Sequence, residues 1–477
     1  MSAPSLRRNY LYTVAMQAVS MLAPLVTAPY VARVLGSEGV GVYSYTLSVA
    51  TTFSLFAALG FGAYGLREIS RVRDDPAAVS RLFWELTLLR GGATLLTGAA
   101  YALVCLPAGQ WRLYGVVGTL IVSTGLDVTW LFQALERFGT LTARHVAVKA
   151  VTVALTFWLV RDAGDVVVYA LVQMGGTLAS HLLLWLCLPS TACRPDGPLR
   201  PLIHLRPSLV YFVPAVATSV YTVLDKTMLG AIAGDMTQSG YYESAHKIIR
   251  LLMTAVASLN VVVGVRTSYL FGQNREAEAR AHLVDTYRFT CALAFPLCGG
   301  LLACGDGFAV AFFGAEFAAA GRMLRLFAPL LVLVGTSNVL GSLYLTPAGY
   351  RRRSNRAIIA GAAVNVVLNL WLIPRFGGFG AVAASVAAEG VIAALYLRFT
   401  HGFLPAGRLV RVAGRYALYG EAVFLAVWPL STRMPPTFGA LAVQTAVGVV
   451  VYAVLLMVWR DPVWGVWRNL RKGGDGG

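Results

Sequence analysis

The sequence predicts an all-α integral membrane protein with about 14 transmembrane helices. Of its 477 residues, 57% are hydrophobic and only 13% are charged, which is too little charge to cover the surface of a water-soluble protein of this length. The apolar residues lie in runs of about 20, the length that spans a bilayer core. Because lipid offers no hydrogen bonds to an open backbone, runs of this length must be helical.

Fourteen apolar segments follow one another along the chain. The first is too long for a cleavable signal peptide and is expected to remain as a span. The polar connections are short, at most about 20 residues, so no separate soluble domain is expected. The predicted spans are 10–35, 40–66, 81–105, 112–136, 141–160, 166–189, 207–233, 239–265, 282–304, 318–346, 355–374, 379–400, 413–431 and 437–459.

The basic residues give the orientation of these spans. Twenty-seven Lys and Arg residues lie in the connections on one side, six lie on the other side, and six lie within spans. The positive-inside rule therefore predicts a multi-pass protein of the bacterial plasma (inner) membrane with both termini in the cytoplasm. The net charge of +17 is explained by orientation, so we expect no nucleic-acid partner. The six basic residues expected outside are Arg112, Arg161, Arg322, Arg325, Arg375 and Arg433.

An internal repeat is visible. "GVYSYTLSV" opens the second span at Gly41, and "GYYESAHKI" opens the eighth at Gly240, an offset of 240 − 41 = 199 residues. Parallel six-span repeats are typical of transporters whose site lies between the halves. We therefore expect an N-terminal six-helix lobe over 1–206, a second lobe that repeats it over 207–402, and two extra helices with a cytoplasmic tail over 403–477.

Six basic side chains fall within predicted spans, where a charge costs about 2.5–3.5 kcal/mol at the bilayer centre. We expect them to line a cationic, substrate-binding cavity. Two alternatives stay open: a residue near a span end can reach the interface, and a residue beside an acid can form a structural ion pair. The six are Arg33 near the end of the first span, Arg90, Lys149, Lys226 after Asp225, Lys247 four residues after Glu243, and Arg250.

Depth separates these candidates. With a helical rise of about 1.5 Å per residue, Arg90 and Lys149 lie roughly 13 Å from the cytoplasmic side, and Arg250 lies close to the midplane. Asp127 and Glu389 also fall near the midplane. A buried carboxylate there suits a proton or sodium site, or equally a partner for a buried arginine. Asp225 and Glu243 are further candidates for ion coupling or pairing.

No catalytic chemistry is indicated. The chain has no GxxxxGK[ST], HExxH or GxSxG motif, so neither a nucleotide-driven motor nor a hydrolase is expected. Its six cysteines and six histidines lack metal-ligand spacing. We therefore expect a protein that is not an enzyme and that needs no cofactor and no metal.

Several stretches resemble a known family. The opening "RNYLYTVAMQAVSMLAPLVTAPYVARVLGSEGVGVYSYTLSV" is similar to the start of bacterial polysaccharide-biosynthesis flippases of the Wzx type. "DVTWLFQALERF", "VLDKTMLG", "GYYESAHKIIRLL" and "AVNVVLNLWLIPRFGGFGAVAASVAAE" continue the resemblance in order along nearly the whole chain. These flippases belong to the MOP superfamily, together with MATE multidrug exporters and lipid II flippases.

The resemblance implies two MATE-like lobes around a central cavity, with two further helices at the C-terminus. It implies a cargo of oligosaccharide on undecaprenyl pyrophosphate, moved to the outer leaflet for O-antigen, capsule or exopolysaccharide synthesis. A cationic lining would offset the charge of the pyrophosphate. We expect alternating access, driven by an H⁺ or Na⁺ gradient or by consumption of the product, with membrane lipids and other polysaccharide-assembly proteins as further partners.

Three alternatives remain. A lipid II flippase would need the same cationic cavity. A MATE-type multidrug or ion antiporter has the same fold, but the excess of basic over acidic residues within the spans disfavours cationic drugs. A membrane polysaccharide polymerase would need a large outer loop with catalytic residues, which this sequence lacks.

Overall fold

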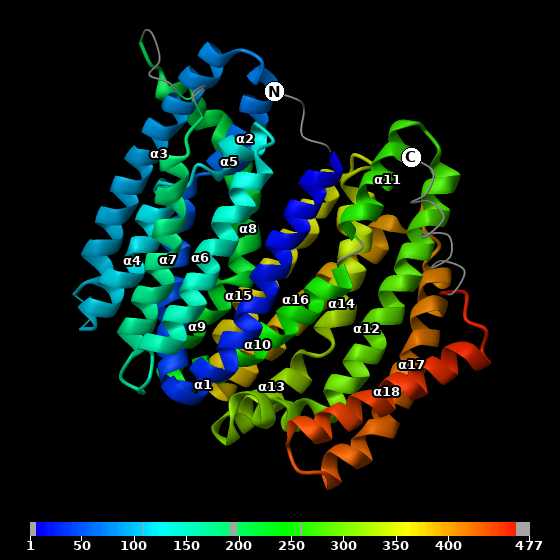
Figure 1. Cartoon of the computed structure of the whole chain (residues 1–477). Coiled ribbons are helices and arrows are strands. Elements are labelled where there is room, and N and C mark those ends of the chain that lie inside the picture. The colour runs from blue at the N-terminus through cyan, green and yellow to red at the C-terminus, as the bar shows by residue number, and fades with distance from the viewer. Residues whose placement is uncertain (1–5, 108, 190–191, 193–197, 258–259, 464–477) are drawn as a thin grey trace. The chain divides into compact units, whose positions relative to one another are not determined.

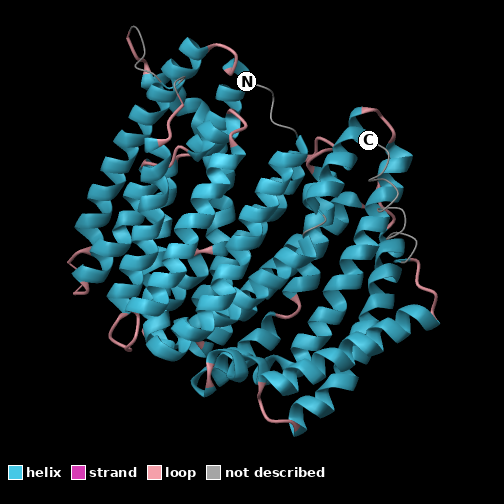
Figure 2. Ribbon diagram, in the orientation of Figure 1, coloured by secondary structure: helices cyan, strands magenta, loops and turns pink. Residues whose placement is uncertain are grey.

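Every regular element that the structure describes is a helix. The computed structural model describes residues 6–463 apart from 108, 190–191, 193–197 and 258–259, and Figure 2 shows helices and loops but no strand in this part of the chain. The helices need no partner strand for their backbone hydrogen bonds, which is the condition for crossing lipid. The predicted all-α membrane fold is confirmed.

The chain forms two compact units. Unit 1 comprises residues up to 231 and residues 235–240, and unit 2 comprises residues 232–234 and those from 241 onward. Figure 1 labels the helices. Those of unit 1 are α1 (Leu6–Ala58), α2 (Phe61–Val72), α3 (Pro76–Cys105), α4 (Trp111–Gly125), α5 (Thr129–Ala134), α6 (Phe138–Leu159), α7 (Val166–Leu186), the 3₁₀ turn η2 (Pro201–His204), α8 (Leu205–Thr222) and α9 (Leu224–Ala233).

Unit 2 begins within a helix, because the first turn of α10 (Met236–Ala257) belongs to unit 1. The helices that follow it are α11 (Asn260–Gly272), α12 (Glu276–Phe313), η3 (Ala315–Phe317), α13 (Ala318–Phe327), α14 (Leu330–Ser337), η4 (Asn338–Leu345), α15 (Arg351–Phe376), α16 (Gly378–Thr400), α17 (Ala406–Arg433) and α18 (Phe438–Val458).

Eight helices in the described part are long and apolar enough to cross a membrane, and the bent pair from Ala315 to Leu345 makes a ninth. The helices α6 and α10, which carry Lys149 and Lys247, are outside this set. The count of 14 spans therefore stays a prediction. The division at 206 and 402 also stays a prediction, since the units follow spatial contacts, which group α8 with α2, and the predicted lobes follow a sequence repeat.

A glycine separates the first two predicted spans. Within α1, Gly36 has φ 67° and ψ 178°, and the helix turns sharply there (Figure 1). This φ lies in the left-handed region, which glycine adopts without a steric penalty. The turn falls in the interval predicted between spans 10–35 and 40–66, so the sequence placed this boundary correctly.

One predicted span in unit 2 is irregular. The segment 318–346 consists of α13, α14 and η4, with a bend of 43° between the two halves. Its last eight residues, Asn338–Leu345, form a π-helix. Short π-helical turns are rare and frequent at functional sites. This segment therefore combines a bend with a π-helical end.

The two repeat-related glycines lie against each other. A Cβ on Gly41 would overlap the carbonyl of Met236, four residues before Gly240, and a Cβ on Gly240 would overlap the carbonyl of Ser37, four residues before Gly41. All four residues belong to unit 1. The contact is reciprocal, and it brings the two backbones closer than any side chain would allow.

We predict that Gly41→Ala and Gly240→Ala each lower the melting temperature by a few degrees, because a methyl group cannot enter this contact. Thermal unfolding of the purified protein in detergent measures this. Gly175→Ala in α7 is the matched control: a Cβ there meets nothing within 4 Å, so the better helix propensity of alanine should leave stability equal or higher. Equal melting temperatures for all three variants would contradict the close contact.

Candidate functional site

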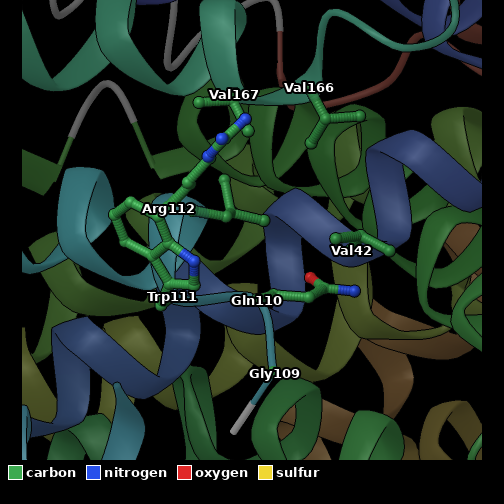
Figure 3. A pocket seen from close by; sticks show the side chains of 8 residues that line it. Val42, Gly109, Gln110, Trp111, Arg112, Val166 and Val167 are labelled. Atoms are coloured by element: carbon green, nitrogen blue, oxygen red, sulfur yellow. The ribbon is translucent and has the colours of Figure 1, made fainter. Parts of the chain in front are cut away.

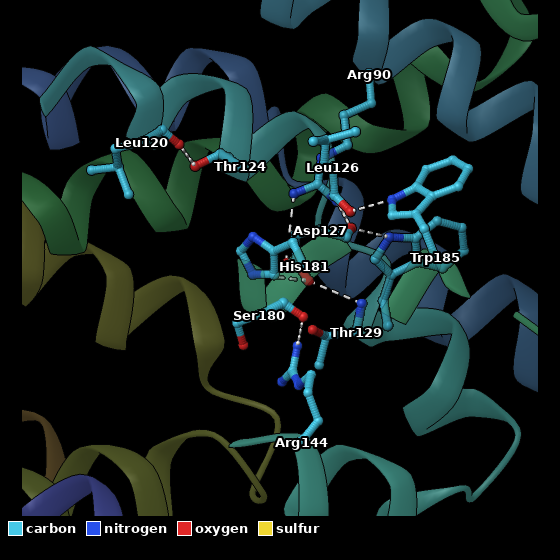
Figure 4. A network of polar contacts seen from close by, with 11 residues as sticks. Arg90, Leu120, Thr124, Leu126, Asp127, Thr129, Arg144, Ser180, His181 and Trp185 are labelled. Carbon is cyan, nitrogen blue, oxygen red and sulfur yellow. Dashed lines mark hydrogen bonds and ion pairs between the residues drawn. The ribbon is translucent and has the colours of Figure 1, made fainter. Parts of the chain in front are cut away.

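A helix break in unit 1 holds Asp127. Residues 126–128 are not helical, although α4 and α5 lie on either side. The freed carbonyls accept hydrogen bonds from side chains of other helices (Figure 4): Arg90 Nη1 donates to the Asp127 carbonyl at 2.6 Å, and Trp185 Nε1 donates to the Leu126 carbonyl at 2.8 Å. Trp130 Nε1 also donates to the Asp127 carbonyl, at 3.0 Å. Irregular backbone among membrane helices requires such partners.

The carboxylate of Asp127 has partners of its own. Its Oδ2 lies 3.7 Å from Arg90 Nη2, and its Oδ1 accepts a hydrogen bond from the Thr129 backbone N–H at 2.9 Å. His181 Nε2 lies 3.8 Å from the same Oδ1. The Arg90 side chain is only 5% exposed, so its charge depends on this carboxylate. Arg90 and Asp127, two predicted site residues, thus form an ion pair.

Aromatic packing fixes the tryptophans that reach the break. Phe83 of α3 lies between them, with ring centroids 5.8 Å from Trp130 and 6.0 Å from Trp185. Because these rings are held on α3, α5 and α7, their indole N–H groups point at the break without further ordering.

This network has more donors than acceptors. Arg144 of α6 donates through Nη1 to the Ser180 carbonyl at 2.9 Å (Figure 4). Among the described residues, Arg144 Nε and Arg90 Nε are buried without a hydrogen-bond partner. Two guanidinium groups and an imidazole therefore surround a single carboxylate. Such a surplus of donors suits an anion better than a cation.

Lys149 has no acid beside it. It is half-buried on α6, and no hydrogen bond or ion pair links it to another described residue. His145, one turn earlier on the same face, meets Ser20 of α1, with Nε2 and Oγ 2.8 Å apart. The face of α6 that carries Lys149 therefore turns toward α1.

In unit 2, one predicted cation is paired and one is not. Lys247 Nζ lies 3.6 Å from Glu243 Oε1, the i,i+4 pair that the spacing allowed. Arg250 is exposed, and no side-chain hydrogen bond or ion pair joins it to another described residue. Glu389 is buried on α16, which packs against α15 and α14.

The remaining predicted residues are spread over unit 1. Arg33 is exposed near the turn of α1, as expected of a residue that reaches the interface. Asp225 is buried at the start of α9, and Lys226 beside it is half-buried. None of the three belongs to the Asp127 network drawn in Figure 4. Their assignment to a substrate site stays a prediction.

Sequence reasoning missed four members of the Asp127 network. Arg144 falls close to the start of a predicted span and was counted among the cytoplasmic charges. His181, Trp130 and Trp185 are single polar or aromatic residues in apolar runs. The 3.6-residue periodicity of a helix does not identify them as members of a site, because their partners come from other helices. A predicted helix break beside Asp127 would have pointed to these residues, but the break lies within a predicted apolar span and was not recognised.

A pocket of about 440 Å³ lies at the other end of α4 (Figure 3). Arg112 and Trp111 open the helix, with the guanidinium 5.4 Å from the indole centroid, and Gln110 precedes them. Val166 and Val167 of α7 complete the opposite wall. Near this wall, the backbone N–H groups of residues 161 and 162 donate to the Asp165 carboxylate at 2.8 and 2.9 Å, which lowers its pKa.

No metal centre is formed by the residues that the structure describes, in which no group of three or more His, Cys, Asp or Glu residues could hold an ion. The side chains gathered around Asp127 are arginine, histidine and tryptophan. The arginine and tryptophan side chains among them donate hydrogen bonds and are not metal ligands.

The helical architecture is that of a multi-pass membrane protein. The fold matches the solved structure titled "Lipid II flippase MurJ, inward closed conformation" with a TM-score of 0.71 over 95% of this chain and 100% of that chain, at 14% identity. A MATE family multidrug resistance transporter of the MOP superfamily, in an inward-facing conformation, matches with a TM-score of 0.59 over 83% of this chain and 99% of that chain, also at 14% identity.

Sequence comparison gives the family. The chain belongs to the polysaccharide biosynthesis protein family, whose profile matches residues 6–265. It is 24% identical over 408 residues to the Escherichia coli (strain K12) protein named "Putative O-antigen transporter", covering 83% of this chain and 96% of that protein. The resemblance seen in the sequence is thereby confirmed.

We predict that Arg90 and Asp127 are energetically coupled. Arg90→Leu should destabilise the protein by about 3–5 kcal/mol, because it leaves the Asp127 carboxylate without its guanidinium partner and removes one of the two side-chain donors to the Asp127 carbonyl. Arg90→Leu combined with Asp127→Asn should be less destabilised than the sum of the two single changes, by about 1 kcal/mol or more. Thermal or denaturant unfolding in detergent measures the cycle. Additive effects would show that the two side chains do not depend on each other.

Proposed function

We propose that this chain is a flippase that moves an oligosaccharide linked to undecaprenyl pyrophosphate from the cytoplasmic to the outer leaflet of the bacterial plasma membrane. Membership of the polysaccharide biosynthesis family supports a role in polysaccharide export. The relative named as an O-antigen transporter supports a lipid-linked glycan as cargo. The observation that carries the choice of an anionic carrier is the environment of Lys149.

Lys149 lies in the middle of α6, far from either end of the helix. A lysine at this depth is costly unless an anion or water meets it. No described acidic side chain pairs with it, and the cation Arg144 lies on the same helix. A pyrophosphate supplies the missing oxygen atoms and forms charge-assisted hydrogen bonds, which are about twice as strong as neutral ones.

The other cations divide by their partners. Arg250 is exposed and lacks an acidic partner among the described residues, so it is the second proposed phosphate contact. Arg90 and Lys247 already face Asp127 and Glu243, so they hold the helices in place and contribute only residual positive charge. Arg33 and Lys226 stay as outer members of the proposed cationic path.

Transport proceeds by alternating access of two repeat-related halves, as in other transporters built from repeats. The bent segment of α13, α14 and η4 supports a moving element in unit 2, since an irregular helix absorbs changes in direction at lower cost than a straight one. Glu389 is the proposed coupling group for H⁺ or Na⁺. Consumption of the glycan by other assembly proteins outside is the alternative source of direction.

We predict that Lys149→Gln lowers flipping about tenfold or more, because a hydrogen bond to a charged group contributes about 1.5–3 kcal/mol. The measurement uses liposomes with a fluorescent undecaprenyl-pyrophosphate oligosaccharide in both leaflets and a membrane-impermeant quencher outside. Arg250→Ala should also lower the rate. Arg408→Gln, which removes an exposed charge at the start of α17, is the control and should flip at the wild-type rate.

Unchanged flipping in folded Lys149→Gln protein would remove this residue from the site. If wild-type protein fails to flip this lipid, with or without a sodium or proton gradient, but flips lipid II, the cargo is lipid II. If it flips neither lipid and instead exchanges small cations, the chain acts as a MATE-type antiporter.

A further inference from the structure

Two polar side chains meet between α1 and α6, one turn from Lys149. His145 of α6 is half-buried, Ser20 of α1 is exposed, and the two helices pack against each other. Ser20 lies about midway between Leu6, where α1 begins, and the turn at Gly36. Polar groups at this depth in a membrane are costly unless they meet water, a partner or a ligand. The pair therefore marks a polar surface that the two helices share.

The hydrogen bonds of Ser20 determine the tautomer of His145. Ser20 Oγ lies 2.8 Å from His145 Nε2 and also 2.8 Å from the Met16 carbonyl oxygen. A hydroxyl group has one proton and a carbonyl oxygen only accepts, so Ser20 donates to Met16. His145 Nε2–H then donates to Ser20 Oγ, and both contacts are satisfied. In this neutral tautomer, His145 Nδ1 has a lone pair and no proton.

His145 Nδ1 is open to a ligand. No hydrogen bond joins it to another described residue, and it is not among the buried atoms that lack a partner. The same is true of Lys149 Nζ. Residues four apart on a helix lie on one face, with their Cβ atoms about 5–6 Å apart. A single ligand can therefore contact both nitrogen atoms.

The charged neighbours of His145 are basic. Arg144 and Lys149, both on α6, are the charges that act on it, and Asp127 already has cationic partners of its own. The helices α1, α5 and α7 pack against α6. The described titratable side chains on α5, on α7 and on α1 over residues 11–36 are Tyr12, Tyr30, Arg33, Tyr169 and His181. None of these is an acid, so a proton on an empty site would add a third positive charge there.

We propose that His145 is a second phosphate contact, which takes up a proton at Nδ1 when the carrier pyrophosphate reaches Lys149. The proton comes from water and returns to water when the lipid leaves. Nδ1–H then donates to one phosphoryl group and Lys149 Nζ to the other, each in a charge-assisted hydrogen bond. This links lipid binding to pH through a base in the site, independently of Glu389. The identity of the ligand rests on the proposed function.

Lipid binding and protonation of His145 favour each other. A bound anion stabilises the protonated imidazole, so the affinity of the wild type is highest at low pH and falls as the pH rises through the range of histidine. A terminal phosphate gains negative charge over the same range, which by itself would strengthen binding at high pH. Because the two trends are opposite, the slope of affinity against pH identifies the contribution of the histidine.

The first experiment measures binding of a fluorescent undecaprenyl pyrophosphate to the purified full chain in detergent, from about pH 5.5 to about pH 8. We expect the affinity of the wild type to fall about tenfold over this interval, as one charge-assisted contact is lost. His145→Gln keeps a polar side chain beside Ser20 but takes up no proton. Its affinity should be lower than that of the wild type at the acidic end, and constant or rising with pH.

His401→Gln is the matched control. His401 is exposed in the turn after α16, so this variant loses a histidine away from the proposed site and should follow the wild type at every pH.

NMR of protein with ¹⁵N-labelled histidine measures the protonation of His145 directly. The chain has six histidines, and the His145 signals are assigned by their loss in His145→Gln. Without lipid, Nε2 should carry the proton and Nδ1 should not. Saturating undecaprenyl pyrophosphate should protonate Nδ1 at neutral pH, and undecaprenol should not. The measurement is made on the wild-type side chain, so a folding defect in a variant does not decide it.

Three results would each overturn the inference: an Nδ1–H tautomer without lipid, an Nδ1 that stays unprotonated when the pyrophosphate binds, or an equal pH dependence of His145→Gln and wild type. If the wild type still binds the lipid in such a case, the proposed function stands and the role of His145 alone fails. If the wild type binds no undecaprenyl pyrophosphate at any pH, the proposed function and the role of His145 are both contradicted.

Discussion

The Arg90 guanidinium determines whether α4 can break where it does. Residues 126–128 leave the helix among apolar segments, where lipid supplies no hydrogen bonds. Arg90 meets both the carbonyl and the carboxylate of Asp127, and Trp185 meets the carbonyl before it. Three other helices, α3, α5 and α7, thus supply the partners that α4 has lost, and α6 adds Arg144 beside them. The packing of unit 1 around this point follows from that single requirement.

The requirement that a buried charge or carbonyl has a partner also separates structural charges from functional ones. A cation with a carboxylate at hand is already compensated, as Lys247 is by Glu243. Lys149 has no such compensation within the described chain, and its neighbours on α6 are basic. The charged groups that bear on function are therefore those whose partner the protein does not supply.

Much of the architecture could be predicted from the sequence, because the length and spacing of apolar runs are dictated by the bilayer. The turn at Gly36 and the helical state of the chain followed from these runs. The Lys247–Glu243 pair followed from helical spacing. Contacts between helices could not be predicted from the sequence. Arg90 and Asp127 are 37 residues apart, and neither apolar run indicates that its charged residue pairs with the other. The break that positions Asp127 is also not marked by hydropathy, since Leu126 and Val128 on either side of Asp127 are apolar.

The two glycines that the sequence repeat relates are in close contact. Gly41 and Gly240 begin similar phrases 199 residues apart, and their backbones touch in a reciprocal way. The similarity between the two stretches accounts for the contact between these two glycines only. Tyr43 and Tyr242, which follow them, are both buried, but they pack on different rings, Tyr169 and Phe327. The repeat therefore extends to the close contact and not to every neighbour of it.

The central claim is that Lys149 meets the pyrophosphate of the carrier lipid. The chain has only four lysines, Lys149, Lys226, Lys247 and Lys472, so reductive methylation with ¹³C-formaldehyde gives few signals. The Lys149 signal is assigned by its loss in Lys149→Gln. Addition of undecaprenyl pyrophosphate should shift this signal in a saturable way, and undecaprenol, which lacks the pyrophosphate, should not. A Lys149 signal that stays in place, or that moves equally with undecaprenol, would contradict the account.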